Sequence, residues 1–569
     1  MKRFTQKSWS KWLMLLAFLG YGSVYAQSDS NGESPVTKTY AFKNATVIQA
    51  PGKSLSKTTV LVKNGVISAV GTSVQIPPDA QVIAADSLYI YAGFIDGLNQ
   101  TGVKRPENQG RVRAENPAKP TYTESGVTPQ VSVLEQVDFK SAQLEEWRKA
   151  GFTTAHIVPY GRMLPGSGSV VSLAAHGAVD AMVLKGNNSM YAQFTGAGGT
   201  YPSNSLGIMA MWRDLYKNAQ LSWEHQNLYK ANPSGIERPI NDQVLASFYP
   251  TLNKERGVVF NATGLLEAKR ALDLQKQLGF PLILGNLKEG WTLIDQIKAS
   301  NTKVFLSLAL PEKKEAKKAD GDAAWLASEK EARNERIEEA YKMYVAQAAT
   351  FEKAGIKFGF AGIDAKSGDL KKNLKVMMDN GLSETAALAA LTTNPAEILG
   401  MSNQLGTVEA GKLANLMIST APYFTEDAQI KYMMADGMLY EYEIKAPAKK
   451  TNGNGNGNAS NASFDPAGTW DFTSPTPMGE INGKMVIEKA ASGYTGKMTV
   501  NTPEGSSSED MTLIKAEGDK LSFQINQSVQ GMTITLNVSG TVSGTKFTGN
   551  MDTGQFGAFP ISATKNPGL

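Results

Sequence analysis

A repeated pattern of short apolar strands and amphipathic helices, between Gly93 and Leu399, most constrains the fold of this chain. The segments "GVVFNATG" and "GFPLILGN" are short and apolar, and "LLEAKRALDLQKQLG" between them has helical periodicity. Strands that alternate with helices are typical of a parallel α/β domain, in which a helix crosses from one strand to the next. The pattern predicts an α/β fold whose main part, residues 93–403, is a TIM (β/α)8 barrel.

Residues before and after the barrel segment read as short strands. Residues 38–92 alternate apolar and polar positions, and turn signals such as Lys63-Asn64-Gly65 separate the runs. Residues 404–445 return to strands after the last predicted helix. We therefore expect residues 38–92 and 404–445 to form one composite β-sandwich that flanks the barrel.

The first residues of the chain have the pattern of an export signal. Basic residues precede an apolar run from Trp12 to Gly20, and small residues precede Gln27. The run is shorter than the roughly 20 residues that span a bilayer. The pattern predicts a signal peptide over residues 1–26, no transmembrane segment after its removal, and an exported protein, periplasmic or extracellular.

The C-terminal part of the chain has a different composition from the barrel segment. Residues 446–463 are rich in Asn and Gly and contain no side chain able to anchor a core, which predicts a flexible linker. Beyond it, residues 464–569 alternate apolar and polar positions between Gly-containing turns. We expect a separate C-terminal antiparallel β domain, with Trp470 and Phe523 in its core.

Charge and cysteine content exclude several classes of function. The chain has 57 basic and 53 acidic residues, a net charge of +4, so no excess of one sign would attract a nucleic-acid backbone. There is no Cys, which excludes disulfides, thiolate metal sites and a cysteine nucleophile. We expect no nucleic-acid partner.

Three motifs, in order along the chain, resemble those of the amidohydrolase superfamily, particularly its imidazolonepropionase-like exported members. "AGFIDGLNQTG" is similar to the family's P-G-F-I-D-x-H-x-H, and "GIDAKSGDL" with "GLSETAALAALTTNPAEILGM" resembles its last barrel strand and the following helix. "LGTVEAGKLANLMI" resembles G-x-L-x-x-G-x-x-A-D-L, where the chain leaves the barrel. The resemblance covers residues 38–445 and implies a metal-dependent hydrolase fold, with activity on carbon–nitrogen bonds other than peptide bonds.

The resemblance also implies a metal site that this sequence lacks in part. The family's metal-bound water attacks the substrate, and its ligands are mainly imidazoles. Here Leu98 and Gln100 occupy the H-x-H positions, and the whole chain has three His. By loose alignment, later histidine positions are degenerate as well, at Asn261, Thr263 and Asn286. The resemblance leaves Asp364 as the one catalytic residue.

Other interpretations of these residues remain open. His156 lies on an apolar strand and either points into a pocket or is a hydrogen-bonded core residue. Asp96 is either a pocket residue or a structural residue at its strand end. With Gln100, Asn261, Asn286 and Asp364 it would give an oxygen-only site that suits Mg²⁺ or Ca²⁺ better than Zn²⁺. Asp364 alternatively caps the segment that follows it.

Three hypotheses for the function follow. The first is a pseudoenzyme: a catalytically degraded amidohydrolase that acts as a binding or partner subunit, as a homo-oligomer or with an intact homologue, and needs no cofactor. The second is an active hydrolase of cyclic amides or other C–N bonds with a remodelled or single-metal site, holding Zn, Mg or Ca. The third is an envelope-binding protein that acts through residues 464–569. A small-molecule ligand fits the first two.

Overall fold

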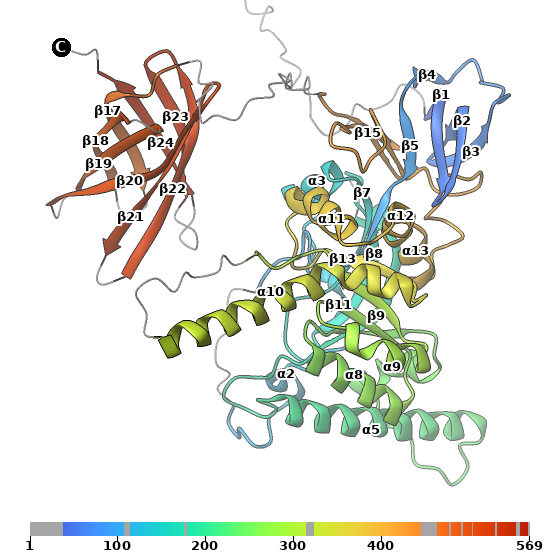
Figure 1. The fold of residues 1–569 in the computed structure, drawn as a ribbon. Helices are drawn as coiled ribbons and strands as arrows, with labels where there is room; N and C mark the ends of the chain where they lie inside the picture. The colour runs from blue at the N-terminus through green and yellow to red at the C-terminus, as the bar shows by residue number, and fades with distance from the viewer. Residues whose placement is uncertain are drawn as a thin grey trace, which may run out of the picture. The chain divides into compact units, whose positions relative to one another are not determined.

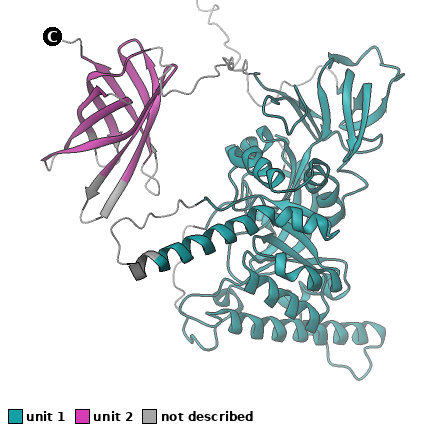
Figure 2. Ribbon diagram, in the orientation of Figure 1, with its two compact units in different colours: residues 1–447 teal, residues 448–569 magenta. Residues whose placement is uncertain are grey.

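The computed structural model describes residues 38–106, 114–175, 179–313, 324–444, 464–476, 479–490, 493–502, 505–529, 532–552 and 558–566. The chain divides into two compact units, residues 1–447 and 448–569 (Figure 2). Each unit has a hydrophobic core of its own. The predicted signal peptide and the predicted linker lie outside the described residues.

An eight-stranded sheet forms the barrel of the first unit (Figure 1). Its strands lie in chain order: β6 (Phe94–Asn99), β7 (Phe152–Ile157), β8 (Gly166–Ser172), β9 (Val183–Gln193), β10 (Gly257–Asn261), β11 (Leu282–Leu287), β12 (Lys303–Ser307) and β13 (Phe358–Ala361). Neighbouring strands are parallel, except that β8 is antiparallel to both β7 and β9. The predicted TIM-type barrel is confirmed, with one antiparallel strand that the (β/α)8 pattern did not predict.

The antiparallel strand β8 follows from the sequence on either side of it. The connection from Ile157 to Gly166 is shorter than the dozen or so residues that a parallel crossover needs. After β8, the helix α4 (Val179–Met182) has only four residues. Gly168 lets β8 approach β7 closely, because a Cβ at this position would lie 2.7 Å from Nε2 of His156.

Helices cover the outside of the barrel (Figure 1). They are α2 (Tyr122–Ser125), α3 (Ala142–Lys149), α4, α5 (Ser205–Ala231), α6 (Gln243–Ala246), α7 (Tyr249–Leu252), α8 (Leu265–Leu278), α9 (Ile294–Ala299), α10 (Ala324–Lys353), α11 (Leu370–Asp379), α12 (Glu384–Leu391) and α13 (Thr393–Ile398). In the described ranges, three short 3-10 helices accompany them: η1 (Val133–Glu135), η2 (Trp291–Leu293) and η3 (Ser367–Asp369). The core between helices and strands contains the buried Trp212, which meets Phe248 edge-on and meets Phe260 and Phe280 at tilted angles.

The helix α8 shows how the sequence determines one of these elements. Its buried positions Ala268, Ala271 and Leu272 recur at helical spacing and face the strands. Gly279 ends the helix in the left-handed conformation, with φ 77°, where a residue without Cβ is not strained.

Hydrogen bonds link the first barrel strand, β6, to the residues that directly follow the last strand, β13. The amide of Ile363 donates to the carbonyl of Leu98 at 3.0 Å. The amide of Gly362 donates to Oδ1 of Asp96 at 2.9 Å. A Cβ at Gly362 would lie 2.2 Å from Oδ2 of Asp96, so only glycine fits here without a shift. Asp96 therefore joins β6 to the end of β13.

A second eight-stranded sheet combines strands from both flanks of the barrel. It consists of β1 (Thr39–Ala50), β2 (Lys53–Lys63), β3 (Val66–Gly71), β4 (Gln81–Ala84), β5 (Tyr89–Ala92), β14 (Leu416–Ser419), β15 (Ile430–Ala435) and β16 (Met438–Glu441). β5 and β14 pair antiparallel, with Ala92 opposite Leu416. The two flanks share one core, which includes the buried Phe42, Val60 and Leu416. The expected composite β unit beside the barrel is thus present.

The second unit is a closed antiparallel barrel. Its strands are β17 (Gly468–Thr476), β18 (Gly479–Ala490), β19 (Gly493–Thr502), β20 (Gly505–Glu517), β21 (Lys520–Val529), β22 (Met532–Ser543), β23 (Lys546–Asp552) and β24 (Ala558–Lys565), each paired with the next, and β24 pairs with β17. Alternate side chains point inward, and Trp470 and Phe523 are buried as predicted. The separate C-terminal antiparallel β domain is confirmed.

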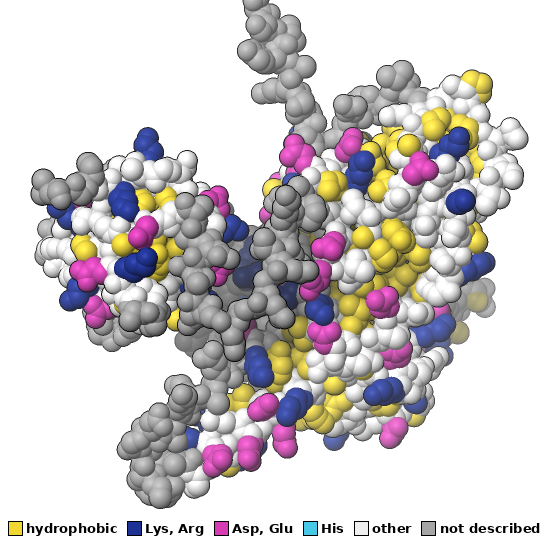
Figure 3. Space-filling view, turned by 45° about the horizontal axis from the view of Figure 1, so that its top comes forward, with side chains coloured by type: hydrophobic (Ala, Val, Ile, Leu, Met, Phe, Trp, Pro, Cys, Tyr) yellow, Lys and Arg dark blue, Asp and Glu magenta, His cyan; other side chains and the backbone are white. Residues whose placement is uncertain are grey.

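The surface agrees with the balanced composition. Lys and Arg side chains are interspersed with Asp and Glu over the visible face (Figure 3). Among the helices described, none combines the length and the apolar character that crossing a bilayer requires.

Candidate functional site

The carboxylate of Asp364 joins a polar cluster at the carboxyl-terminal ends of the barrel strands, the end at which barrels of this type carry their active sites. Asp364 lies shortly after β13. Its Oδ2 accepts hydrogen bonds from Nδ2 of Asn286 and from Nζ of Lys288, both at 2.7 Å. Both partners come from the end of β11. The ion pair is partly open to water, because the side chains of Lys288 and Asp364 are 30% and 43% exposed.

Opposing effects act on the pKa of Asp364. Burial raises this pKa, whereas the hydrogen bonds from Lys288 and Asn286 and the positive charge of Lys288 lower it. The result is a pKa below the usual range of an aspartate. Asp364 is therefore ionised at neutral pH, and the ammonium of Lys288 balances its charge.

A bulge in β11 turns Asn286 toward this cluster. Ile283 packs in the barrel interior, so regular alternation would also point Leu287 inward. Leu287 instead packs in the outer core, and the pairing of β11 with β12 shifts register between Leu284 and Leu287. Asn286 has a left-handed backbone, φ 56°, which Asn adopts more readily than most residues. Bulges of this kind re-aim side chains near functional sites.

Two neighbouring strands add further polar groups. Asn261 at the end of β10 pairs in register with Gln193 at the end of β9. The hydroxyl of Tyr191 donates to Oε1 of Gln193 at 3.4 Å and is also hydrogen-bonded by the side chain of Asn261. Burial raises the pKa of Tyr191, and the nearby charge of Asp364 raises it further, so this phenol stays protonated.

Two amide oxygens of the cluster lack a partner. Oδ1 of Asn261 and Oδ1 of Asn286 are buried, and within the part of the chain that the structure describes neither accepts a hydrogen bond. Buried polar atoms are normally paired. These oxygens therefore mark places where a molecule that donates hydrogen bonds would be accepted.

The two residues at the H-x-H positions, Leu98 and Gln100, differ in burial and in contacts. Leu98 is fully buried and packs in the barrel interior with Val259, Ile283 and Phe305. Gln100 is only partly buried, and its Nε2 donates to the carbonyl of Pro159 at 3.2 Å. Leu98 has no atom that could bind a metal, and the metal ligand that Gln100 could offer is a neutral amide oxygen.

Thr263 does not join the cluster around Asp364. Its amide and its hydroxyl both donate to Oε2 of Glu267, each at 3.0 Å. Glu267 lies in the first turn of α8, so Thr263 serves the start of this helix.

Asp96 is a structural residue of the barrel seam. Its carboxylate is buried and accepts hydrogen bonds from the amides of Leu98 and Gly362 and from Nδ2 of Asn99. Burial raises the pKa of Asp96 to about 7, although these hydrogen bonds lower it. The oxygens proposed for an oxygen-only site therefore do not all meet, because Asp96 is engaged in the seam.

His156 lies in the barrel interior with both ring nitrogens engaged. Nδ1 lies 3.0 Å from the carbonyl of Gly97, and Nε2 lies 2.9 Å from the hydroxyl of Ser189. The carbonyl can only accept, so Nδ1 carries the proton and Nε2 accepts from Ser189. Burial lowers the pKa of His156 to about 4. Of the other histidines, His225 on α5 contacts the carbonyl of Glu237, and His176 lies outside the described residues.

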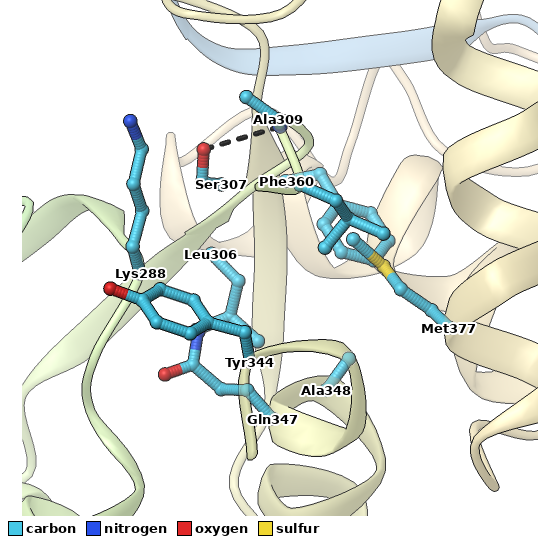
Figure 4. Close-up of a pocket in the computed structure, with 10 residues that line it drawn as sticks. Lys288, Leu306, Ser307, Ala309, Tyr344, Gln347, Ala348, Phe360 and Met377 are labelled. Atoms are coloured by element: carbon cyan, nitrogen blue, oxygen red, sulfur yellow. Dashed lines mark hydrogen bonds between the residues drawn. The ribbon is translucent and has the colours of Figure 1, made fainter. Parts of the chain in front are cut away.

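A small cavity lies beside the stem of Lys288 (Figure 4). It is lined by Ser307, Tyr344, Gln347 and Phe360, among others, and its volume is about 10 Å³. This is about the space that one water needs. The Lys288 side chain extends away from Gln347, with its ammonium at the far end (Figure 4). The cavity is too small for an organic ligand.

The residues of this cluster do not fit the metal that the family resemblance implies. Within the described residues, no three His, Asp or Glu side chains gather closely enough to hold a metal ion. The one carboxylate of the cluster, Asp364, is already paired with the ammonium of Lys288. A zinc-type ion requires imidazole or several anionic ligands. The cluster instead combines one ion pair, neutral amides and a phenol.

Three residues of the polar cluster were not predicted from the sequence: Lys288, Tyr191 and Gln193. Lys288 could have been predicted, because it follows Asn286 by two residues, directly after an apolar strand of a predicted barrel. Tyr191 and Gln193 lie on β9, a strand that the helix–strand alternation did not predict.

The comparisons with known proteins agree with this fold. Residues 312–440 match the Amidohydrolase family. A crystal structure of an amidohydrolase from Thermotoga maritima MSB8 is similar to this chain with a TM-score of 0.57 and 21% sequence identity, over 70% of this chain and 99% of that one. At this identity the likeness shows the fold alone. No curated protein matches the chain.

Two further solved structures are similar at lower scores. One is a Xaa-Pro dipeptidase with bound methionine in the active site, with a TM-score of 0.42 and 15% identity over 71% of this chain and all 100% of that one. The other is molinate hydrolase, with a TM-score of 0.40 and 14% identity over 71% of this chain and 94% of that one.

Proposed function

We propose that this chain is a catalytically degraded member of the amidohydrolase superfamily and that it binds a small molecule at the mouth of its barrel. In this proposal the scaffold and the polar cluster are retained for binding. Hydrolysis by a metal-bound water is lost.

The observation that carries the proposal is the ion pair of Lys288 with Asp364. A metal ion and an ammonium compete for the same carboxylate, because each needs its negative charge and its lone pairs. The positive charge of Lys288 would also repel a divalent cation placed beside Asp364, and this repulsion is strong in a partly buried site. Leu98 and the engaged Asp96 offer no ligands that would offset it.

Binding, rather than packing alone, is supported by the exposure and the chemistry of the cluster. Lys288 and Asp364 are reachable from solvent, and Asn261 and Asn286 each present an unpaired oxygen. A few convergent polar groups at this end of a barrel are typical of small-molecule sites. An inert core would be expected to satisfy these atoms internally.

Metal content per chain tests the proposal. Protein purified without chelators is analysed for bound elements, and again after addition of Zn²⁺, Mn²⁺, Mg²⁺ and Ca²⁺ separately. The expected result is far less than one metal per chain under each condition. Stoichiometric metal that disappears in an Asp364→Ala variant would revive the alternative of an active hydrolase.

An activity screen tests whether hydrolysis is lost. Cyclic amides and other non-peptide C–N substrates are offered to the native chain and to Asp364→Asn. We expect no turnover by either protein. Turnover by the native chain that Asp364→Asn abolishes would overturn the proposal, whereas equal turnover by both would indicate a contaminating hydrolase.

A further inference from the structure

The cluster at the barrel mouth contains more hydrogen-bond acceptors than its own donors use. Asp364 brings a carboxylate, and Asn261 and Asn286 each bring a buried amide oxygen that accepts no hydrogen bond within the described residues. Nδ2 of Asn286 already donates to Asp364 at 2.7 Å, which leaves the oxygen of the same amide as its unused group. The group that fits here is one with several N–H donors and a positive charge.

One such group is already in the cluster. The ammonium of Lys288 has three donors, and one of them is used by Oδ2 of Asp364. Lys288 reaches this position on a flexible four-carbon stem from the strand end, and its side chain is 30% exposed. The cluster therefore accepts an ammonium, and the side chain that carries this ammonium is partly open to solvent.

We propose that the barrel mouth binds a small molecule with a primary ammonium group. This group displaces the ammonium of Lys288 from Asp364 and takes its place. The inference rests on the proposed function and adds the chemical class of the ligand. An organic ammonium suits the cluster better than a divalent metal, because a single carboxylate with neutral amides provides little of the negative charge that a divalent ion requires. No bond is made or broken in the exchange of one ammonium for the other.

Chemical rescue tests the exchange directly. In Lys288→Ala the tethered ammonium is removed and its space is open, so added ethylammonium should occupy the place beside Asp364. We expect a saturable rise in Tm of about 2 °C near ten times the Kd, because a ligand that binds only the folded state stabilises it. Tetramethylammonium at the same concentration, which has no N–H donor, should give no such rise.

Matched variants separate this effect from a general response to salt. Lys288→Met fills the same space with an apolar chain and should not be rescued. Lys276→Ala, which removes a lysine in the last turn of α8, should respond to ethylammonium no more than the native chain does. Lys288→Ala with Asp364→Asn should lose the saturable rise, because the carboxylate that binds the ammonium is gone.

A second measurement does not depend on the folding of the variants. Longer alkylamines are titrated into the native chain by calorimetry, where they must compete with Lys288. Saturable binding that Asp364→Asn weakens at least tenfold supports the inference. If neither the native chain nor Lys288→Ala binds any amine, Lys288 is a purely structural partner of Asp364 and the inference is overturned.

The inference and the proposed function fail in different ways. A native chain that carries stoichiometric metal contradicts the proposed function, whatever the amines do. A metal-free native chain contradicts the inference alone if neither it nor Lys288→Ala binds any amine. If Lys288→Ala takes up Mg²⁺ or Ca²⁺ and not ethylammonium, the cluster is a metal site that Lys288 blocks, which also overturns the inference.

Discussion

The ammonium of Lys288 lies 2.7 Å from Oδ2 of Asp364, although the two residues are 76 positions apart in the chain. β11 and β13 carry them to the same end of the barrel, where a bulge also brings Asn286 to the carboxylate. The ion pair determines the charge at the barrel mouth, because Lys288 keeps Asp364 ionised and balances its negative charge.

Lys288→Met should raise the pKa of Asp364. The hydrogen bond and the positive charge of Lys288 are among the causes that lower this pKa, whereas burial, which raises it, would remain. Titration of the carboxyl carbon by NMR in the native chain and the variant measures the shift. Lys366→Met removes a lysine that is close in sequence but is not among the groups that shift the pKa of Asp364, so it should leave this pKa unchanged. An unchanged pKa in Lys288→Met would show that Asn286 alone holds Asp364 ionised.

The same pair should contribute to stability in a pH-dependent way. The pKa of Asp364 is lower in the folded chain than in the unfolded one, so its contribution is present above the unfolded pKa, about 3.9. It is lost as the pH falls through the lower folded pKa. Lys288→Met should weaken this acid dependence. Because the pair is partly exposed, we expect a change of less than about 1 kcal/mol, measured by urea unfolding at pH 3 and pH 7.

Asp96 should affect the pH dependence of the free energy of unfolding in the direction opposite to Asp364, and Asp96→Asn should remove this effect. Burial raises the pKa of Asp96 to about 7 in the folded chain, so the free energy of unfolding falls as the pH rises from about 4 to about 7. The carboxylate accounts for up to about 4 kcal/mol of this decline. Asp96→Asn removes the decline, although it also costs about 1–3 kcal/mol because Nδ2 of Asn99 loses its acceptor. Urea unfolding at pH 4.5, 5.5 and 7 gives both quantities.

His156→Leu should remove a pH dependence of the free energy of unfolding that is opposite in sign to the one caused by Asp96. Burial lowers the pKa of His156 to about 4, so the free energy of unfolding falls as the pH decreases from about 6.5 to about 4, by up to about 3 kcal/mol. His156 and Asp96 thus oppose each other across one pH range, and the native chain should show a weak net slope. In His156→Leu the slope of Asp96 should appear alone. A steep slope in the native chain and none in either variant would contradict this assignment.

Gly97→Ala should destabilise the barrel. A Cβ at Gly97 would lie 2.1 Å from the ring of Phe305, which is buried in the interior. Overpacking of this kind costs about 1–3 kcal/mol. Gly198→Ala is the control, because a Cβ at Gly198 meets nothing within 4 Å. Thermal unfolding of both variants provides the measurement, and equal stability of the two would mean that Phe305 moves aside freely.

Much of the fold followed from periodicity. The strands that carry Asn261 and Asn286 are short apolar runs between amphipathic helices, and Trp470 and Phe523 follow the alternation of a half-buried strand. The antiparallel strand β8 did not follow, because its sequence "GSGSVVS" reads as a glycine-rich loop. Its pairing depends on Gly168, which leaves room for His156.

The candidate site was predicted only in part. Asp364 and Asn286 were identified through the resemblance, and they lie together. Thr263 was placed beside them, but it is bound to Glu267, a contact that depends on where α8 begins. Lys288 was missed because side-chain direction after a bulge cannot be read from alternation, which assumes a regular strand.

The pairing of β5 with β14 has a consequence for synthesis of the chain. Ala92 and Leu416 lie opposite each other, and the whole barrel lies between them in sequence. β5 therefore cannot gain this neighbour until the ribosome has released β14, and contacts so distant in sequence form late and slowly. Until then β5 presents an unpaired edge, which invites association with other chains. A chain that terminates shortly before Leu416 should therefore aggregate, although it contains every residue of the candidate site.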